Sequence, residues 1–438
     1  MRSAASLIAV AILLILALFA AAGPWLMPGH DHTTVRIAAA AIFVASYAAL
    51  AIGKVPGLSI DRAGVALVGA CLMVACGAMP LPDAYKAVDF DTITLLLGMM
   101  IVVANLRLSG FFALTNAWVA QRAHRPLVLL SAIVAVSGLF SAFLVNDAIC
   151  LVLAPLVAEL AVGLRRNPLP YLLAVAMASN VGSTATITGN PQNMMIGSFS
   201  RIPYAAFVAS LAPVAVVGLI LTVALLAVLH RDEFRGGAER LELHPRRVRT
   251  NQALLLRAVA GTLVLVVLFF AGQPPAKAAI IIGALLLLTR RVRSSRIYAE
   301  IDWSLLLMFT GLFIIVAGAE RTLLTPAVVQ DISRLHLAVV PVLSVVTAVL
   351  SNLVSNVPAV LVLKPFIAAL PDQATAWKVV AMASTLAGNF TILGSVANLI
   401  VVEQAARRGV AIGFWDYFRV GAPLTVLTIV LGTLWLMR

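Results

Sequence analysis

The stretch "TATITGNPQNMMIG", residues 184–197, places a Gly-Asn-Pro break and two more amides inside an apolar segment. No Asp, Glu, Lys or Arg occurs between Arg166 and Arg201, so its flanks are typical of a membrane-spanning helix. Irregular backbone at membrane depth is tolerated only where protein buries it or where it lines a cavity. On its own such a break is more often a loop or a kink, so its meaning depends on whether the rest of the chain repeats it.

The composition supports a membrane setting. Of the 438 residues, 62% are hydrophobic and only 11% are charged, whereas soluble domains are about half apolar and about a quarter charged. The formal net charge of +13 is explained by cytoplasmic loops rich in Lys and Arg, and we expect no nucleic-acid partner. We find no metal-ligand spacing, no catalytic motif and no phosphate-binding loop, so an enzyme, a cofactor and ATP drive are not expected.

Apolar runs predict an all-α polytopic protein with about eleven transmembrane helices. Residues 7–22 also fit a signal peptide, although the run extends to residue 27 and a retained first helix is favoured. Two runs are long enough to enter and leave on one side as re-entrant hairpins. The runs are 7–27, 36–53, 63–80, 91–108, 127–162 (hairpin), 169–199, 205–229, 257–272, 276–290, 304–322, 338–370 (hairpin), 376–406 and 415–437.

Basic clusters set the orientation. The polar linker 230–256 and the arginines at 290–296 must face the same side, the cytoplasm. With both hairpins in place, most of the 31 Lys and Arg residues lie inside, with a cytoplasmic N-terminus and an external C-terminus in the cell inner membrane. We expect five regions: N-terminal scaffold helices and the start of the first repeat (1–125), a first transport-domain unit (126–229), the linker (230–256), scaffold helices and the start of the second repeat (257–335), and a second transport-domain unit (336–438).

The two halves of the chain are related. "SAFLVNDAICLVLAPLV" (141–157) aligns with "SNLVSNVPAVLVLKPFI" (351–367) at an offset of 210. "AMASNVGSTATITGNPQN" (176–193) aligns with "AMASTLAGNFTILGSVAN" (381–398) at an offset of 205. Matching units start on opposite faces in the predicted topology. This is an inverted repeat, which is common in secondary transporters.

Each half contains two helix starts inside apolar runs. Asn190 before Pro191, and Asn356 before Pro358, combine an N-cap with a proline in the first turn. Ser395 can cap in the same way, and Asn146 can cap with Asp147 behind it. Helix N-termini bind anions, and the exposed carbonyls suit a small cation. We therefore predict one central site with broken helices in both repeats.

The residues predicted for this site come from the four breaks. The predicted substrate-binding residues are Asn146, Asp147, Thr184, Gly189, Asn190, Pro191, Asn193, Asn356, Val357, Gly394 and Asn398. The predicted ion-coupling residues are Ser141, Asn146, Asp147, Gly189, Ser351, Ser355, Asn356, Gly394 and Ser395, serving bound sodium ions or coupling protons. Lys364 and Glu403 are further charges within apolar runs, with roles left open.

These motifs resemble the ion transporter superfamily, which includes arsenite permeases, divalent-anion/sodium symporters, citrate transporters and some sodium/proton antiporters. The resemblance covers about residue 35 to the C-terminus. "ASNVGSTATITGNPQN" is most similar to arsenite-permease-like and P-protein-like members. "LVNDAICLVLAPL" and "NLVSNVPAVLVL" resemble the two hairpin tips of the superfamily. The resemblance implies a scaffold that usually forms a homodimer and a transport domain that slides as an elevator.

One departure bears on the substrate. Dicarboxylate members carry Ser-Asn-Thr at both tips, whereas the first tip here reads Val145-Asn146-Asp147. An ionised Asp147 would repel a nearby carboxylate by several kcal/mol at an effective dielectric of about 20. We therefore expect an ion-coupled secondary transporter of a small anion or oxyanion, with arsenite or antimonite efflux as the leading case. The alternatives are a sodium/proton antiporter and a sodium-coupled citrate or dicarboxylate symporter.

Overall fold

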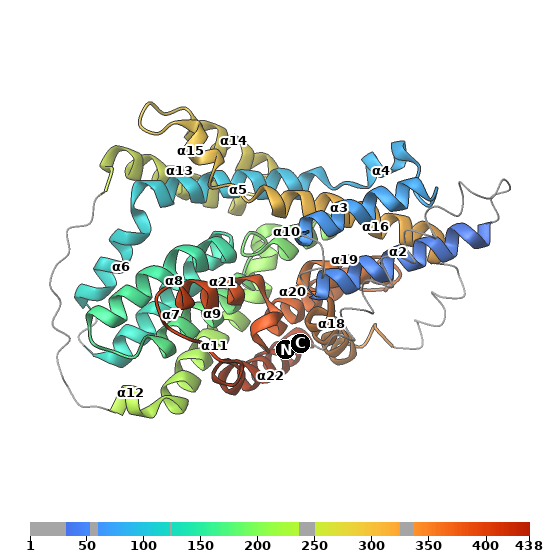
Figure 1. Ribbon diagram of the computed structural model, residues 1–438. Coiled ribbons are helices and arrows are strands. Elements are labelled where there is room, and N and C mark those ends of the chain that lie inside the picture. The colour runs from blue at the N-terminus through green and yellow to red at the C-terminus, as the bar shows by residue number, and fades with distance from the viewer. Residues whose placement is uncertain (1–31, 53–59, 123–124, 236–249, 325–335) are drawn as a thin grey trace. The chain divides into compact units, whose positions relative to one another are not determined.

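The computed structural model describes residues 32–52, 60–122, 125–235, 250–324 and 336–438 (Figure 1). The predicted first span, 7–27, and most of the linker 230–256 lie outside these ranges. Within them every regular element is a helix. The described chain forms two units, each of which combines segments from both halves of the sequence. The first unit contains 1–93 and 302–373, and the second contains 94–301 and 374–438.

The first unit contains α2 (His32–Ile52), α3 (Arg62–Ala75), α4 (Leu81–Ala87), α16 (Trp303–Leu323), α18 (Val340–Val354) and α19 (Asn356–Ile367). Helices α2, α3 and α16 pack against one another (Figure 1). Asp61 caps α3 by accepting from the Gly64 amide at 2.8 Å, and Asp302 caps α16 by accepting from the Leu305 amide at 3.0 Å. Each of these two helices therefore starts directly after the aspartate that caps it.

Helix α5 (Phe90–Ser109) begins in the first unit and continues into the second. The remaining helices of the second unit are α6 (Phe111–Arg122), α7 (Pro126–Phe143), α8 (Asn146–Gly163), α9 (Pro168–Ser183), α10 (Pro191–Ser200), α11 (Tyr204–Leu229), α12 (Arg231–Arg235), α13 (Gln252–Phe270), α14 (Pro275–Leu287), α15 (Ser294–Tyr298), α20 (Gln373–Ala387), the 3₁₀ turn η1 (Ile392–Gly394), α21 (Val396–Ala406) and α22 (Phe414–Leu436).

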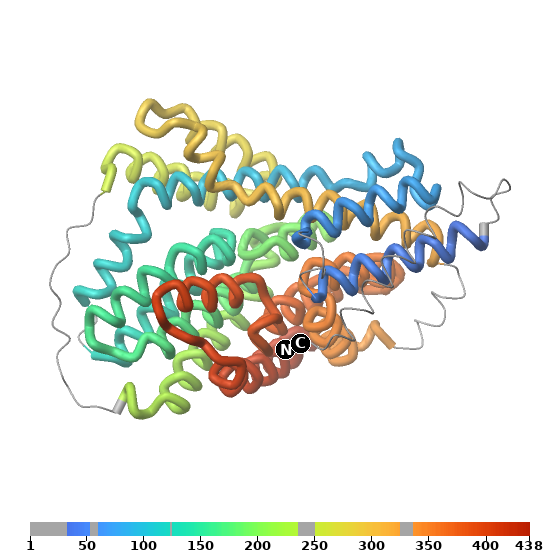
Figure 2. Tube along the Cα trace, viewed as in Figure 1, coloured from blue at the N-terminus to red at the C-terminus, as the bar shows by residue number. Residues whose placement is uncertain are grey.

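Helices α7, α8 and α9 lie side by side in the second unit, with α21 against α8 (Figure 2). The crossing of α7 and α9 is close because two glycines meet there. A Cβ on Gly182 would lie 2.1 Å from the carbonyl oxygen of Gly138. This contact fixes the depth at which the broken helix α9 packs against the hairpin.

The predicted fold class is confirmed. Eight helices among the described residues are long and apolar enough to cross a membrane. Both long apolar blocks are helix pairs, α7–α8 and α18–α19, and both predicted broken helices are interrupted, as α9–α10 and as α20–η1–α21. The protein is a multi-pass, all-helical membrane protein. Helix α6 is additional, because no predicted span covers residues 111–122.

All four predicted helix starts are present, but two of the predicted N-caps were wrong by one residue. Asn190 and Ser395 are the N-caps of α10 and α21. Asn146 and Asn356 are instead the first helical residues of α8 and α19, whose N-caps are Val145 and Ser355. The amides of Asn146 and Asn356 are used in contacts across the hairpin tips, described below, which a local capping rule does not anticipate.

Candidate functional site

The break in the first broken helix is built around Asn190. Its backbone is extended, with φ of −152°, and its Oδ1 accepts a hydrogen bond from the Asn193 amide at 2.8 Å. Pro191 follows in the first turn, where its missing N–H leaves no bond unmade. A Cβ on Gly189 would lie 2.2 Å from the carbonyl oxygen of Ser183. Only glycine fits there, because the end of α9 occupies the space beside it.

Asn193, in the first turn of α10, forms hydrogen bonds back across the same break. Its Nδ2 donates to the Ser183 carbonyl at 3.1 Å and to the Thr186 carbonyl at 3.0 Å. The side chain is fully buried. Both amide hydrogens are therefore used to satisfy carbonyls that the end of a helix leaves without partners.

Asn398 does the same in the second repeat. Its Nδ2 donates to the Gly388 carbonyl at 2.7 Å and to the Thr391 carbonyl at 3.1 Å. All three residues lie 205 positions after Asn193, Ser183 and Thr186, which is the offset of the sequence repeat. The two repeats therefore share the same hydrogen bonds as well as similar residues.

The two breaks also bond to each other reciprocally. Thr385 Oγ1 donates to Asn193 Oδ1 at 3.5 Å, and Asn180 Nδ2 donates to Asn398 Oδ1 at 2.9 Å. Thr385 and Asn180 are themselves equivalent at the offset of 205. This reciprocal pair of hydrogen bonds is one exchange between the two breaks, and a second exchange also joins residues that are equivalent at this offset.

In that exchange Asn190 Nδ2 donates to Thr385 Oγ1 at 3.0 Å, and Ser395 Oγ donates to Asn180 Oδ1 at 3.1 Å. We call the six residues of the two exchanges the amide network: Asn180, Asn190, Asn193, Thr385, Ser395 and Asn398. Each residue of the network is at least 95% buried. Such a network positions both breaks against each other, since a buried polar group without a partner is costly.

The tip of the first hairpin docks on this network. The Asn146 amide donates to the Gly189 carbonyl at 3.0 Å, and Asn146 Nδ2 donates to Asn180 Oδ1 at 3.1 Å. Thr186 Oγ1 donates to the Ala142 carbonyl on the hairpin. The tip and both breaks therefore form one polar region inside the second unit.

Near the tip of the first hairpin, two buried oxygen atoms have no hydrogen-bond partner in the described part of the chain, in addition to Ser137 Oγ one turn earlier on α7. They are Asn146 Oδ1 and Ser141 Oγ, on residues that are 4% and 0% exposed. Buried polar atoms are rarely left unpaired, and each such case in a native protein needs an explanation. A bound solute or cation would supply the missing partner.

The other predicted residues of this unit lie in the same region. Thr184 ends α9 and donates to the Asn180 carbonyl at 3.2 Å. Gly394 ends η1, directly before Ser395. Asp147 is half-buried in the first turn of α8, beside Asn146. Every hydrogen bond made by the side chains of the amide network goes to a neutral group.

Four predicted residues belong to the first unit: Ser351, Ser355, Asn356 and Val357. They lie together at the tip of the second hairpin. Ser351 Oγ donates to Asn356 Oδ1 at 2.6 Å across the tip. Ser355 has φ of 80° and ψ of 159°, a conformation that non-glycine residues rarely adopt. Tyr47 Oη on α2 donates to the Pro358 carbonyl at 3.3 Å and holds the first turn of α19.

Lys364 and Glu403, the two charged residues whose roles the sequence leaves open, have different surroundings. Lys364, on α19 of the first unit, is close enough to Glu320 on α16 for the two charges to interact. Glu403 forms an exposed pair with Arg407, 2.7 Å apart, within the last turns of α21. Among the described residues no three His, Cys, Asp or Glu side chains lie together as a metal site.

The sequence predictions missed Asn180 and Asn389. Asn180 Nδ2 donates to Asn389 Oδ1 at 2.9 Å, and Asn389 Nδ2 donates to the Met177 carbonyl at 3.2 Å. Asn180 is the central residue, since it bonds to the hairpin tip and to three residues of the second break. The signal was present in the aligned repeats, where Asn180 and Thr385 are the polar pair in one column and Thr184 and Asn389 are the pair in another.

A family model described as "Citrate transporter" matches residues 47–387 of the chain. The chain belongs to the citrate transporter family. A membrane protein of 46 kDa from Mycobacterium leprae is 30% identical over 427 residues, covering 91% of this chain and 98% of that protein. The silicon efflux transporter LSI3 of Oryza sativa subsp. japonica is 30% identical over 451 residues, covering 86% of this chain and 93% of the relative.

More distant similarity supports the same assignment. The putative transporter arsB of Dictyostelium discoideum is 25% identical over 491 residues, covering 86% of this chain and 87% of that protein. The crystal structure of the YdaH transporter of Alcanivorax borkumensis has the same fold, with a TM-score of 0.53 and 15% identity over 92% of this chain and 97% of that one. The protein is therefore a secondary transporter and not an enzyme, as the sequence predicted.

Proposed function

We propose that this transporter moves a small oxyanion species across the cell inner membrane, with arsenite- or antimonite-type efflux as the leading specific case. The observation that supports this most directly is the neutrality of the site. Its side chains are amides and hydroxyls, and the nearest sequence neighbour that carries a charge is the acid Asp147. A multiply charged anion would lose its hydration there without gaining a cation.

A hydroxylated acid that is undissociated at neutral pH fits this chemistry better. Each of its hydroxyls can donate to an oxygen such as Asn146 Oδ1 and can accept from a hydroxyl such as that of Ser141. Both of these buried atoms lack partners in the described part of the chain. Arsenous acid is such a solute, and a silicon efflux transporter is among the relatives. The solute would bind without a charge being buried.

The coupling ion is proposed to be sodium or a proton. A sodium ion prefers oxygen ligands, and the carbonyls of the first break beside the hairpin tip, such as that of Gly189, offer them. A proton would instead use the Asp147 carboxyl. The predicted scaffold and transport domains, the elevator motion, the homodimer and the cytoplasmic N-terminus belong to the same proposal.

The chain is also compatible with two rival functions. The family description names citrate, and the first rival is therefore a sodium-coupled citrate or dicarboxylate symporter. Repulsion from an ionised Asp147 opposes that function by about 4 kcal/mol at 4 Å and an effective dielectric of about 20. A sodium/proton antiporter would use Asp147 without any organic solute, and replacing Asp147 with Asn would then abolish proton-linked sodium flux.

A ligand screen by thermal unfolding separates these functions. Purified protein would be heated with arsenite, antimonite, silicic acid, citrate, succinate, sulfate or phosphate, each with and without sodium. A ligand that binds only the folded state raises the unfolding temperature, and the rise grows with the logarithm of the ligand concentration relative to its dissociation constant. Stabilisation by arsenite or silicic acid supports the proposal, and stabilisation by citrate or succinate alone contradicts it.

A further inference from the structure

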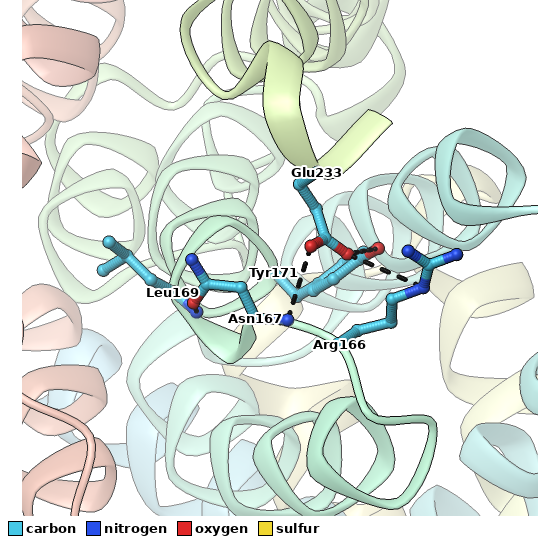
Figure 3. Close-up of polar contacts among 5 residues, drawn as sticks. All are labelled: Arg166, Asn167, Leu169, Tyr171 and Glu233. Atoms are coloured by element: carbon cyan, nitrogen blue, oxygen red, sulfur yellow. Dashed lines mark hydrogen bonds and ion pairs between the residues drawn. The ribbon is translucent and has the colours of Figure 1, made fainter. Parts of the chain in front are cut away.

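The carboxylate of Glu233, on the short helix α12, is held by the connection between α8 and α9. Glu233 Oε1 accepts from Tyr171 Oη at 3.1 Å, and Oε2 accepts from the Asn167 amide at 3.4 Å. Arg166 Nε lies 3.9 Å from Oε1. Figure 3 shows Glu233 reaching from α12 onto Tyr171, with Asn167 and Arg166 on the adjoining turn. The side chains of Glu233 and Arg166 are only 11% and 14% exposed.

The turn that receives Glu233 is itself tightly fixed. Arg165 takes a left-handed conformation, with φ of 53°, and the Arg166 amide donates to the Ala161 carbonyl at 2.8 Å. This closes the C-terminus of α8. Asn167 then caps α9, because its Oδ1 accepts from the Leu169 amide at 3.0 Å.

Glu233 completes this cap from another helix. In a capping box, the backbone amide of the N-cap residue is bound by an acid three residues further along the same helix. Here the N-cap amide of Asn167 is bound by Glu233, which lies 66 residues away in the sequence. The negative charge also sits at the N-terminus of α9, where the helix dipole favours it.

Tyr171 connects this cap to the body of α9. The residue is fully buried, so its hydroxyl depends on Glu233 for a partner. Its ring also packs edge-on against Phe234, with centroids 6.0 Å apart. At about 1.5 Å of rise per residue, Asn180 lies roughly 14 Å further along the same helix. A shift of the first turn of α9 is therefore carried to the centre of the amide network.

From these contacts we propose that Glu233 is a positioning residue. It fastens the start of the polar linker to the first broken helix and sets the axial position of α9 against the hairpin α7–α8. Cys150 on α8 and Ser179 on α9 report on that position, because their Sγ and Oγ atoms are hydrogen-bonded at 2.9 Å and both residues are fully buried. The proposal does not depend on which solute is transported.

The test measures the reactivity of the Cys150 thiol. Replacing Cys71 and Cys76 with Ala leaves Cys150 as the one thiol of the chain. The full-length protein would be labelled with a small maleimide well below its unfolding temperature. Glu233→Ala should raise the labelling rate of Cys150 roughly tenfold, because it leaves the Tyr171 hydroxyl and the Asn167 amide without their partner. Glu233→Gln keeps one acceptor oxygen and should give an intermediate rate.

Two controls separate positioning from general loss of stability. Glu403→Gln removes a carboxylate that pairs only with its own helix in the described contacts, and it should leave the rate unchanged. Leu265→Ala truncates a buried side chain on α13 and should lower the unfolding temperature without exposing Cys150. A wild-type rate in Glu233→Ala, or an equal rise in Leu265→Ala, would overturn the proposal.

Discussion

Asn193 and Asn398 each donate two side-chain hydrogen bonds to backbone carbonyls ten and seven residues before them, in breaks that are equivalent in the two repeats. The bonds range from 2.7 to 3.1 Å. This equivalence assigns the two asparagines a shared task, which is to close the broken helices. The ligand-facing atoms are then to be sought elsewhere, at the hairpin tip.

Replacing either asparagine with Ala should destabilise the protein by similar amounts. Each variant leaves two buried carbonyls unpaired, at a cost on the order of 2–4 kcal/mol in total. Chemical unfolding in detergent would measure this. Asn116→Ala serves as the control, because Asn116 Nδ2 donates one bond, to the Leu156 carbonyl at 3.3 Å. A loss for Asn193→Ala no larger than that control would be inconsistent with its closing role.

Gly189→Ala should be among the most damaging single methyl additions. The new Cβ would lie 2.2 Å from the Ser183 carbonyl oxygen, so the break must open or Asn146 at the hairpin tip must undock from the Gly189 carbonyl. Overpacking of this kind costs roughly 1–3 kcal/mol. Gly163→Ala is the matched control, since nothing lies within 4 Å of its Cβ. Equal unfolding temperatures for the two variants would refute the close approach.

Ser355 offers a test of strain in the second hairpin. At φ of 80° and ψ of 159° a side chain is disfavoured by about 1–3 kcal/mol, whereas glycine adopts this conformation freely. Ser355→Gly should therefore be more stable than Ser355→Ala by roughly 1 kcal/mol, after allowing for the greater freedom of unfolded glycine. Thermal unfolding of the pair measures the difference. A more stable Ala variant would show that the tip is unstrained.

The lowered pKa of His230 predicts how the stability of the folded protein depends on pH. It lies just beyond the apolar span of α11, and burial lowers its pKa below the usual 6.5, although the charges of Glu233, Asp416 and Asp232 act in the opposite direction. Below about pH 6.5 the unfolded chain then binds more protons than the folded one, so stability falls as pH falls.

Unfolding temperatures measured from about pH 8 to about pH 5 should show this loss, and His230→Gln should reduce it. The Gln variant cannot take up a proton, so its profile isolates the contribution of this group. An unchanged profile in His230→Gln would assign the acid sensitivity to other residues.

Much of the fold follows from the sequence because apolar runs and helix-start signals are local. Asn190 followed by Pro191 is sufficient to place the start of α10, and the offset of 205 is sufficient to find its partner. The local rules fail where a side chain serves a distant contact. Asn146 was predicted as a cap, yet its amide bonds to Asn180, 34 residues away.

The aligned repeats mark Asn180 as one of a polar pair, but its central position among the hydrogen bonds could not be predicted, for the same reason. Within its own helix it resembles a polar residue of ordinary packing, and its importance comes from partners more than 200 residues later. Glu233 is a similar case, because nothing near it in the sequence indicates that it caps α9. The predicted domain boundaries and site roles stay predictions.

The neutral hairpin-tip site should bind an undissociated hydroxylated acid such as arsenous acid, and flux of arsenite into proteoliposomes measures this. We predict saturable, ion-gradient-driven flux for the wild type and for Glu403→Gln. In Asn146→Ala, which removes the unpaired Oδ1 and the bond to Asn180, flux should fall at least about tenfold, equivalent to roughly 1.4 kcal/mol. Arsenite flux no faster than in empty liposomes, or equal flux in Asn146→Ala, would rule out binding of this solute at the hairpin tip.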